Sequence, residues 1–311
     1  MAINFDNVAE KLRNWGRWGP EDQRGTLNHI DPAALKRGAS SVKQGKLFCV
    51  GLNYDSNGPQ QGGGRVNPLR TATAVDAPLG PPGSRAGYAD DVVTMFLQAA
   101  TQWDSFAHVH YDGVMYNNFK VCDHLSAAGA AKCGIEHLAR PGITSRGVLL
   151  DIARLKGVDI LPRDYAITPD DLNAACEKYG VTMEKGDILL VRTGQIREFT
   201  INGDRAAFNG LQAGLSPTCC EWMHDKSVAA VTADNMAVEI LRAEPDPAYG
   251  ELMPLHMLTL RDMGMPLGEI FDFEELSADS AKDGQYTFMF SGPPLPFTNG
   301  FGSPLNPQVI K

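Results

Sequence analysis

The sequence contains 311 residues, of which 43% are hydrophobic and 21% charged, and this composition is typical of a folded globular protein. Lysine and arginine number 28 against 37 acidic residues. The resulting net charge of −9 argues against nucleic acid as a partner, because phosphates require a basic surface. No apolar run reaches the roughly 18 residues that cross a bilayer, and the N-terminal segment lacks the apolar core of a secretory signal.

Six cysteines are scattered along the chain without a C-x-x-C spacing. They are interpreted as reduced thiols, so we expect a cytoplasmic protein with no membrane partner. No linker and no repeat of fixed period is visible, and residues 1–311 are therefore expected to form a single domain. Within it, residues 1–90 are expected to form an N-terminal arm and loop region that packs on the rest.

Glycine and proline are concentrated between residues 57 and 87, which predicts a long N-terminal loop. Two interpretations stay open for this loop. It is either a surface excursion or a flap over a pocket, because long loops in compact domains often carry function. The same segment could also serve an interface between subunits.

Regular elements are predicted from short-range signals in chain order. A helix is expected after Asp31, and another runs from Thr168, a good N-cap, to Gly180, which suits the position after a helix. A third helix is expected after Ser216. Apolar runs bounded by breakers predict four strands, at residues 92–98, 146–153, 185–193 and 228–234. Strands that alternate with helices in this way predict an α/β fold.

The segment from residue 98 to residue 119 is the richest in groups that can perform chemistry. Its amides, carboxylates and imidazoles are Gln98, Gln102, Asp104, His108, His110 and Asp112. Aromatic side chains lie among them, and such a mixture is typical of a small-molecule pocket. Asp104 and His108 are four residues apart and would share one face of a helix. No H-E-x-x-H or zinc-knuckle spacing is present, so packing and surface roles stay open for each residue.

His256 and Glu269 form a second candidate cluster, because each lies in an otherwise apolar context. A carboxylate in such a context needs a cation, a proton or a metal as its partner. The structural alternative places His256 in helix packing and Glu269 at a solvated strand edge. From these residues alone, the structural alternative is favoured.

Taken together, the two clusters resemble the cyclase superfamily, which includes bacterial kynurenine formamidase, isatin hydrolase and trans-dienelactone hydrolase. The family motif H-x-G-T-H-x-D-x-x-x-H aligns with residues 98–108, and a later histidine–glutamate pair aligns with His256 and Glu269. The other similar stretches are residues 18–30, 146–151, 186–194, the segment around Asp234, and residues 299–307. The resemblance implies a swivelling β/β/α domain, an enzyme, and a homodimer or homotetramer.

The first two histidines of the family motif, which are metal ligands in the family, are replaced here by Gln98 and Gln102. A neutral amide oxygen is a weaker ligand than imidazole for zinc and similar metals. Family members with two metal positions hold one of them with four other residues, all of which are present here. The resemblance therefore implies that one position for Zn²⁺ or Mn²⁺ survives. Its expected ligands are Asp104, His108, His256 and Glu269.

The resemblance implies an arylformamidase-like hydrolase that cleaves an amide, lactone or other cyclic carbonyl bond in a small aromatic or cyclic substrate. A metal-activated water would attack the carbonyl, and Glu269 or His108 would carry the proton to the leaving group. Gln102 would donate its amide NH₂ to the developing oxyanion, and Asp104 completes the catalytic set. The residues expected to contact substrate are Gln98, Trp103, Tyr111, Tyr116 and Asn28.

Two alternatives to a metal-dependent hydrolase stay open. In the first, the same aspartate, histidines and glutamate act without metal as general acids and bases in a cyclase, dehydratase or isomerase, with each carboxylate orienting an imidazole. The replacement of two histidines by glutamines favours this alternative. In the second, the site binds a small ligand without catalysis.

Overall fold

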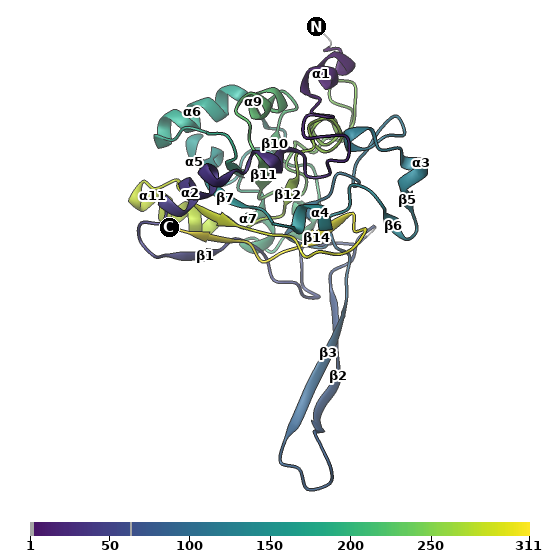
Figure 1. The fold of residues 1–311 in the computed structure, drawn as a ribbon. Coiled ribbons are helices and arrows are strands. Elements are labelled where there is room, and N and C mark those ends of the chain that lie inside the picture. The colour runs from purple at the N-terminus through teal and green to yellow at the C-terminus, as the bar shows by residue number, and fades with distance from the viewer. Residues whose placement is uncertain (1–2, 63) are drawn as a thin grey trace.

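The computed structural model describes residues 3–62 and 64–311, and its centre is a nine-stranded mixed sheet (Figure 1). In spatial order the strands are β1 (Leu47–Cys49), β15 (Gln308–Ile310), β13 (Thr287–Ser291), β7 (Thr144–Asp151), β9 (Ile188–Arg192), β11 (Ala230–Ala233), β12 (Leu267–Glu269), β4 (Gln102–Asp104) and β14 (Gly302–Pro304). The central four, from β7 to β12, are parallel, and the strands on either side of them pair antiparallel. This is the mixed α/β fold that the sequence predicts.

The parallel strands are almost entirely buried, which explains why they form nearly continuous apolar runs in the sequence. All residues of β9 and β11 are buried, as are the last five residues of β7. Helices cover both faces of an all-parallel core, so alternation of polar and apolar residues is lost there. Three of the four predicted strands are confirmed, as β7, β9 and β11. The strand predicted over residues 146–153 ends earlier than expected, because β7 stops at Asp151 and the chain continues as α5 (Ile152–Leu155).

The predicted helix boundaries agree with the caps in the structure. In α6 (Pro169–Tyr179), the Thr168 side chain accepts from the Asp171 backbone N–H, while Asp171 accepts from Thr168 in return. Gly180 follows with φ of +62°, a left-handed conformation that favours glycine. Asp31 caps α2 (Pro32–Ser40), and α9 (Cys219–Asp225) follows Ser216 as expected.

The remaining helices are short and mostly connect strands. They are α1 (Phe5–Leu12), α3 (Val121–His124), α4 (Glu136–Ala139), α7 (Ile196–Thr200), α8 (Arg205–Phe208), α10 (Pro254–His256), α11 (Glu274–Asp283), η1 (Gly25–His29), η2 (Tyr116–Asn118) and the π-helical η3 (Met257–Met263). Two small sheets pair β8 (Ala166–Ile167) with β10 (Gly214–Leu215), and β5 (Leu125–Ser126) with β6 (Gly129–Ala130). No helix in the described ranges is both long and apolar enough to span a bilayer.

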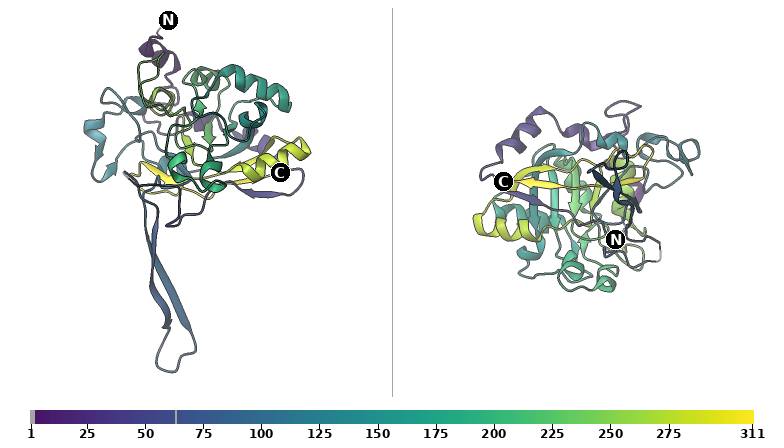
Figure 2. Two further views of the ribbon diagram at one scale, coloured as in Figure 1. Left: turned by 180° about the vertical axis from the view of Figure 1, so that it is seen from behind. Right: turned by 90° about the horizontal axis from the view of Figure 1, so that it is seen from below.

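The predicted loop over residues 57–87 is wrong in part, because residues 69–78 form a strand of a long hairpin that projects from the body of the molecule, and residues 79–86 are the turn of that hairpin (Figures 1 and 2). Its strands are β2 (Leu69–Pro78) and β3 (Gly87–Thr94), paired antiparallel. The predicted strand over 92–98 covers only the end of β3. Glycine and proline are concentrated in the turn and in the segment before β2, whereas β2 contains alternating threonine and alanine and β3 contains a Val-Val-Thr run. Gly63 lies outside the described residues.

Candidate active site

The two candidate clusters of the sequence meet because β4 and β12 are neighbours in the large sheet. The strands are antiparallel, and Glu269 on β12 lies opposite Gln102 on β4. Successive side chains of a strand point to opposite faces, so Gln102 and Asp104 share one face while Trp103 points to the other. The sheet register therefore places the carboxylates of Asp104 and Glu269 on the same side. His256 reaches them from the end of α10.

Asp104, His256 and Glu269 form a compact buried cluster. Each offers one ligand atom, and these atoms all lie within 4.8 Å of one another. The Nε2 atom of His256 is 3.2 Å from Oε1 of Glu269 and 3.9 Å from Oδ2 of Asp104. Two carboxylates removed from water are stable only with a cation between or beside them. The cluster is therefore built to hold a positive charge.

His108 connects this cluster to an open cavity of about 500 Å³ at the base of the hairpin. Its side chain is 22% exposed, and its Nε2 atom lies 3.9 Å from Oδ1 of Asp104. The cavity lining combines polar and apolar side chains, namely Arg65, Phe96, Gln98, His108, His110, Leu125 and Phe301 with Gly64 and Ala107. A small molecule in this cavity would reach the buried carboxylates past His108.

Glu239 holds His256 in place, and the sequence prediction missed it. Its buried carboxylate accepts hydrogen bonds from the backbone N–H groups of Leu255 and His256, at 3.2 and 3.0 Å, and contacts Nδ1 of the His256 ring. A carboxylate on one ring nitrogen fixes the orientation of the other, which here faces Asp104 and Glu269. Glu239 stands between two apolar residues in the sequence, the same signal that drew attention to Glu269.

Gln102 binds the two carboxylates with its amide group. Its Nε2 atom donates to Oε2 of Glu269 at 2.6 Å and to Oδ1 of Asp104 at 3.3 Å. The NH₂ group that was expected to stabilise an oxyanion is thus hydrogen-bonded to two carboxylates in this arrangement. Two buried oxygens, Oε1 of Gln102 and Oδ2 of Asp104, have no hydrogen-bond partner among the described residues.

The ionisation of the cluster follows from burial and from its internal charges. Burial lowers the pKa of His256, but hydrogen bonds to Glu239 and Glu269 outweigh burial and raise the pKa to about 10. Burial and the adjacent Asp104 raise the pKa of Glu269 to about 7, although His256 acts in the opposite direction. Asp104 raises the pKa of His108, whereas burial and His256 lower it, and the balance lies below the usual value. Protonated His256 therefore balances the carboxylates when no metal is bound.

These donors fit a divalent metal ion. The orphaned Oδ2 atom of Asp104, the Glu269 carboxylate and the oriented Nε2 atom of His256 are ligands that suit Zn²⁺ or Mn²⁺. Metal-binding histidines commonly have a carboxylate on the other ring nitrogen, as Glu239 is here. The structure groups three of the four expected ligands, and His108 stands outside that group.

Trp103 does not face the cavity, contrary to the expectation that it contacts substrate. Its indole is fully buried, its Nε1 atom donates to the Gly292 carbonyl at 2.6 Å, and its ring contacts Phe271 and Phe290. The strand pleat explains this, because Trp103 points away from the face that carries Gln102. Its role is in the core.

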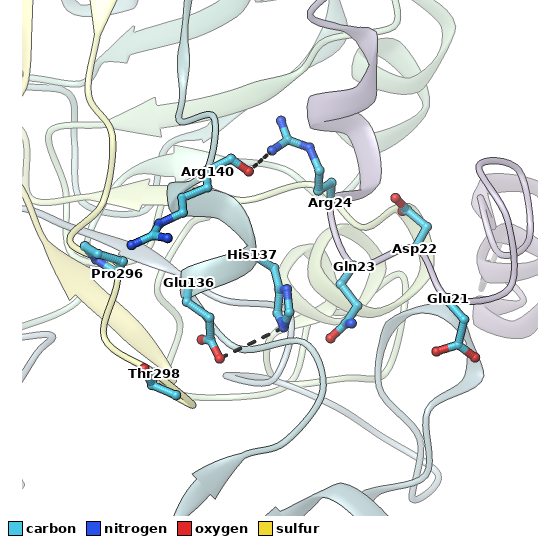
Figure 3. A pocket seen from close by; sticks show the side chains of 9 residues that line it. All are labelled: Glu21, Asp22, Gln23, Arg24, Glu136, His137, Arg140, Pro296 and Thr298. Carbon is cyan, nitrogen blue, oxygen red and sulfur yellow. Dashed lines mark hydrogen bonds and ion pairs between the residues drawn. The ribbon is translucent and has the colours of Figure 1, made fainter.

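Three further residues expected at the substrate are bound elsewhere. The hydroxyl of Tyr116 and the amide of Asn28 donate to Asp22 at 2.9 and 2.8 Å. Asp22 lines a different, polar cavity of about 550 Å³, in which Arg24 contacts the Arg140 carbonyl (Figure 3). The hydroxyl of Tyr111 donates to Asp262 at 2.6 Å. Of the five expected substrate contacts, Gln98 is the one that lines the cavity beside His108.

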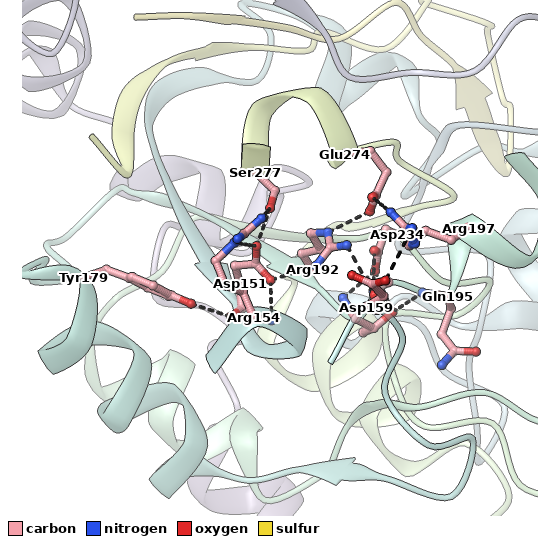
Figure 4. A network of polar contacts seen from close by, with 12 residues as sticks. Asp151, Arg154, Asp159, Tyr179, Arg192, Gln195, Arg197, Asp234, Glu274 and Ser277 are labelled. Atoms are coloured by element: carbon pink, nitrogen blue, oxygen red, sulfur yellow. Dashed lines mark hydrogen bonds and ion pairs between the residues drawn. The ribbon is translucent and has the colours of Figure 1, made fainter. Parts of the chain in front are cut away.

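Asp234 follows the buried strand β11, in one of the stretches that resemble the family. Its carboxylate accepts from the backbone and hydroxyl of Thr193 and from the Gly194 backbone, at 2.6 to 2.7 Å. It belongs to the polar network that surrounds Arg192 (Figure 4). Its bonds join the ends of β9 and β11, which indicates a structural role.

Comparison with known proteins shows similarity in both sequence and structure. The sequence signature of the family described as "Putative cyclase" matches residues 26–240, a stretch that ends before His256 and Glu269. A crystal structure described as that of a novel cyclase is 37% identical, with a TM-score of 0.87 over 97% of this chain and 99% of the other. Comparison with functionally curated sequences gave no match.

More distant solved structures share the fold alone. Isatin hydrolase A from Ralstonia solanacearum is 18% identical, with a TM-score of 0.61 over 89% of this chain and 94% of the other. A structure described as a potential metal-dependent hydrolase with cyclase activity is 15% identical, with a TM-score of 0.52 over 85% of this chain and 96% of the other.

Proposed function

The chain belongs to the Putative cyclase family, and from this premise we propose that it is a hydrolase of an amide, lactone or other cyclic carbonyl bond in a small molecule. One observation carries the proposal: Asp104, His256 and Glu269 converge within 4.8 Å beside a cavity of about 500 Å³. Polar groups that converge at a cavity of this size are typical of a small-molecule site.

The proposed cofactor is one Zn²⁺ or Mn²⁺ ion held by Asp104, His256 and Glu269. Such an ion, when bound, would polarise a carbonyl oxygen and lower the pKa of a bound water toward about 7. Glu239 would keep the His256 imidazole aimed at the ion, and Gln102 would hold Asp104 and Glu269 apart at a fixed separation.

His108 is the proposed proton carrier, because it lies between the buried cluster and the cavity. Its pKa lies below the usual value, so the ring is neutral near pH 7 and can accept a proton from an attacking water. The same ring can then donate that proton to the leaving group. This role requires that His108 does not bind the metal itself.

The cavity lining favours a flat or cyclic substrate that becomes an anion. Phe96, Leu125 and Phe301 supply apolar surface for a ring. Hydrolysis of a lactone or a cyclic amide produces a carboxylate, and Arg65 in the same lining can bind it. Arylformamidase-like cleavage of a formamide is one activity within this class.

The experiment combines metal analysis with a substrate screen. Protein purified without added metal is analysed for its elements and assayed against formamides, lactones and isatin-like rings. We expect about one Zn or Mn per chain, and His256→Ala is expected to abolish metal content and turnover together. His224→Ala is the matched control and is expected to keep both, because His224 belongs neither to the buried cluster nor to the cavity lining. Full activity in His256→Ala would refute the proposal.

A metal-free acid–base enzyme is the second candidate, and the Gln102 amide favours it. The NH₂ group already bridges both carboxylates, and protonated His256 supplies the cation that they need, so this arrangement does not require a metal ion. His108 and Glu269 would then act as base and acid in a cyclisation, dehydration or isomerisation. Activity that survives exhaustive chelation, in protein shown to be metal-free, would decide for this candidate.

A further inference from the structure

The polar cavity of about 550 Å³ beside Asp22 is separate from the candidate active site (Figure 3). Its lining comes from three parts of the chain, within residues 21–24, 136–140 and 296–298. None of these lining residues borders the cavity beside His108. The hydrolase proposal therefore leaves this second cavity without a role.

Arg24 lines this cavity as a half-buried cation without a carboxylate partner. Among the described residues, its guanidinium group donates to the carbonyl of Arg140 and forms no ion pair. Burial lowers the pKa of Arg24, and the more distant carboxylate of Asp22 acts in the opposite direction. Removal of a charge from water is costly unless an opposite charge compensates it. Arg24 can therefore still accept an anion as its partner.

Two other arginines that are at least as buried show what Arg24 lacks. Arg146 contacts Asp187 at 2.6 Å, and Arg192 contacts Asp151 at 3.0 Å. Burial lowers the pKa of both guanidinium groups, but their carboxylate partners outweigh burial and raise the pKa above its usual range. The pKa of Arg24 is shifted in the opposite direction because the protein provides no such partner.

Arg140 supplies a second cation to the same lining. Its side chain is exposed, and its guanidinium group forms no ion pair or hydrogen bond with the described residues. Because Arg24 donates to the backbone of Arg140, the two residues are in direct contact. Gln23 adds a neutral donor, since its Oε1 atom accepts from the Cys133 backbone at 2.8 Å and its NH₂ group stays available to a ligand.

The three carboxylates of the lining already have partners. Glu21 contacts Lys132 at 2.8 Å, and both oxygens of Asp22 accept hydrogen bonds. One oxygen of Glu136 accepts from the Asn299 backbone at 2.9 Å, and the other is buried away from the cavity space. These carboxylates leave the two guanidinium groups unpaired, but their charges would repel a ligand that carries more than one negative charge.

We propose that this cavity is a second ligand site, which binds a small monocarboxylate through Arg24 and Arg140. A guanidinium group matches a carboxylate with two parallel hydrogen bonds, and such bonds between charged groups are strong. A phosphate dianion fits less well, because the carboxylates of the lining oppose its second charge. The proposal does not rest on the hydrolase function, since the two cavities have different linings.

One loop borders both cavities. Pro296 and Thr298 line the polar cavity, whereas Phe301 lines the cavity beside His108. The Phe301 carbonyl accepts from the Ser105 backbone at 3.1 Å, which ties this loop to the segment that carries Asp104. A carboxylate in the polar cavity would therefore lie against a loop that also reaches the candidate active site.

The test measures binding of lactate to the full chain by isothermal titration calorimetry. We expect lactate to bind with a Kd of about 1 mM, as suits a ligand with few atoms. Lactamide, its neutral counterpart, and inorganic phosphate above its second ionisation are expected to bind at least about tenfold more weakly.

Arg24→Gln and Arg140→Gln are each expected to weaken lactate binding at least about tenfold. Arg140 is exposed, so its variant guards against misfolding caused by the change at Arg24, and circular dichroism confirms that each variant is folded. Arg85→Gln is the matched control, because it removes the same charge from an exposed position outside both cavities. It is expected to bind lactate as the natural chain does.

Hydrogen exchange locates the bound lactate. We expect slower exchange within residues 21–24, 136–140 and 296–298 of the natural chain. Lactate that fails to bind at concentrations up to about 50 mM would overturn the proposal. Equal binding in the natural chain and in both variants would overturn it, as would slower exchange confined to the surroundings of Arg65 and His108. Phosphate that binds as tightly as lactate would refute the preference for a monocarboxylate.

Discussion

Replacement of Glu239 tests how the site is held together. This carboxylate is 1% exposed and accepts two backbone N–H groups and one ring N–H. Glu239→Ala would leave three buried donors without a partner, at about 1–3 kcal/mol each. Water that enters the vacated space would solvate some of these donors, so we expect a loss of roughly 3–6 kcal/mol in the free energy of unfolding. That is a large share of the about 5–15 kcal/mol typical of a folded domain.

Glu239→Gln separates stability from metal binding. One oxygen acceptor remains, but the new NH₂ group faces a donor, so we expect a loss of about 1–2 kcal/mol in the free energy of unfolding. The His256 ring loses its charged partner, and metal affinity is expected to fall about 10- to 100-fold. Urea denaturation gives the stability, and competition with a chelator gives the affinity.

Glu244→Gln is the matched control for these variants, because Glu244 is an exposed glutamate in the same chain segment. It is expected to stay within about 0.5 kcal/mol of the natural protein. A Glu239→Ala protein that unfolds within about 1 kcal/mol of the natural protein and binds metal equally well would refute the positioning role of Glu239.

Three further predictions concern the network, the pH dependence and the cavity. Arg192→Met removes the buried partner of Asp151 and Glu274 and is expected to cost about 3–5 kcal/mol of unfolding free energy in urea. Burial, with smaller effects of nearby cations, lowers the pKa of His29 to about 4 in the folded protein, whereas the value in the unfolded chain is near 6.5. The unfolded chain therefore binds a proton before the folded protein does. The stability that neutral His29 contributes is present above pH 6.5 and is lost as the pH falls toward 4. After allowance for partial solvent contact we expect a loss of about 2 kcal/mol in urea titrations, which His29→Gln abolishes. Arg65→Ala is expected to raise KM about tenfold for substrates that carry a carboxylate and to leave neutral ones unchanged.

Each of these predictions has its own control. Arg163→Met, at an exposed ion pair, is expected to change stability by less than about 1 kcal/mol, and an equal loss in both arginine variants would contradict the network. The pH interpretation fails if His29→Gln keeps the natural acid dependence. Arg70→Ala lies on the hairpin and not in the cavity lining, so an equal rise of KM in that variant would exclude a contact with Arg65.

The sequence alone determined the elements whose signals are local. Thr168 and Gly180 predict the two ends of α6, because a helix cap involves residues only three or four positions apart. The runs that form β7, β9 and β11 are visible because buried parallel strands exclude polar residues. The resemblance of residues 98–108 to a family motif also pointed to Asp104 before any distance was known.

Tertiary structure decided which side chains meet. The register that sets Glu269 opposite Gln102 joins segments far apart in the chain, and the pleat then turns Trp103 into the core. Glu239 belongs to the site because it accepts hydrogen bonds from the backbone of α10, and the spacing of residues in the sequence does not predict these bonds. The hairpin is likewise a tertiary result, because glycine and proline describe a turn but not the length of the strands beside it. Local conformation depends on residues that are neighbours in the sequence, whereas contacts between distant strands depend on how the whole chain packs.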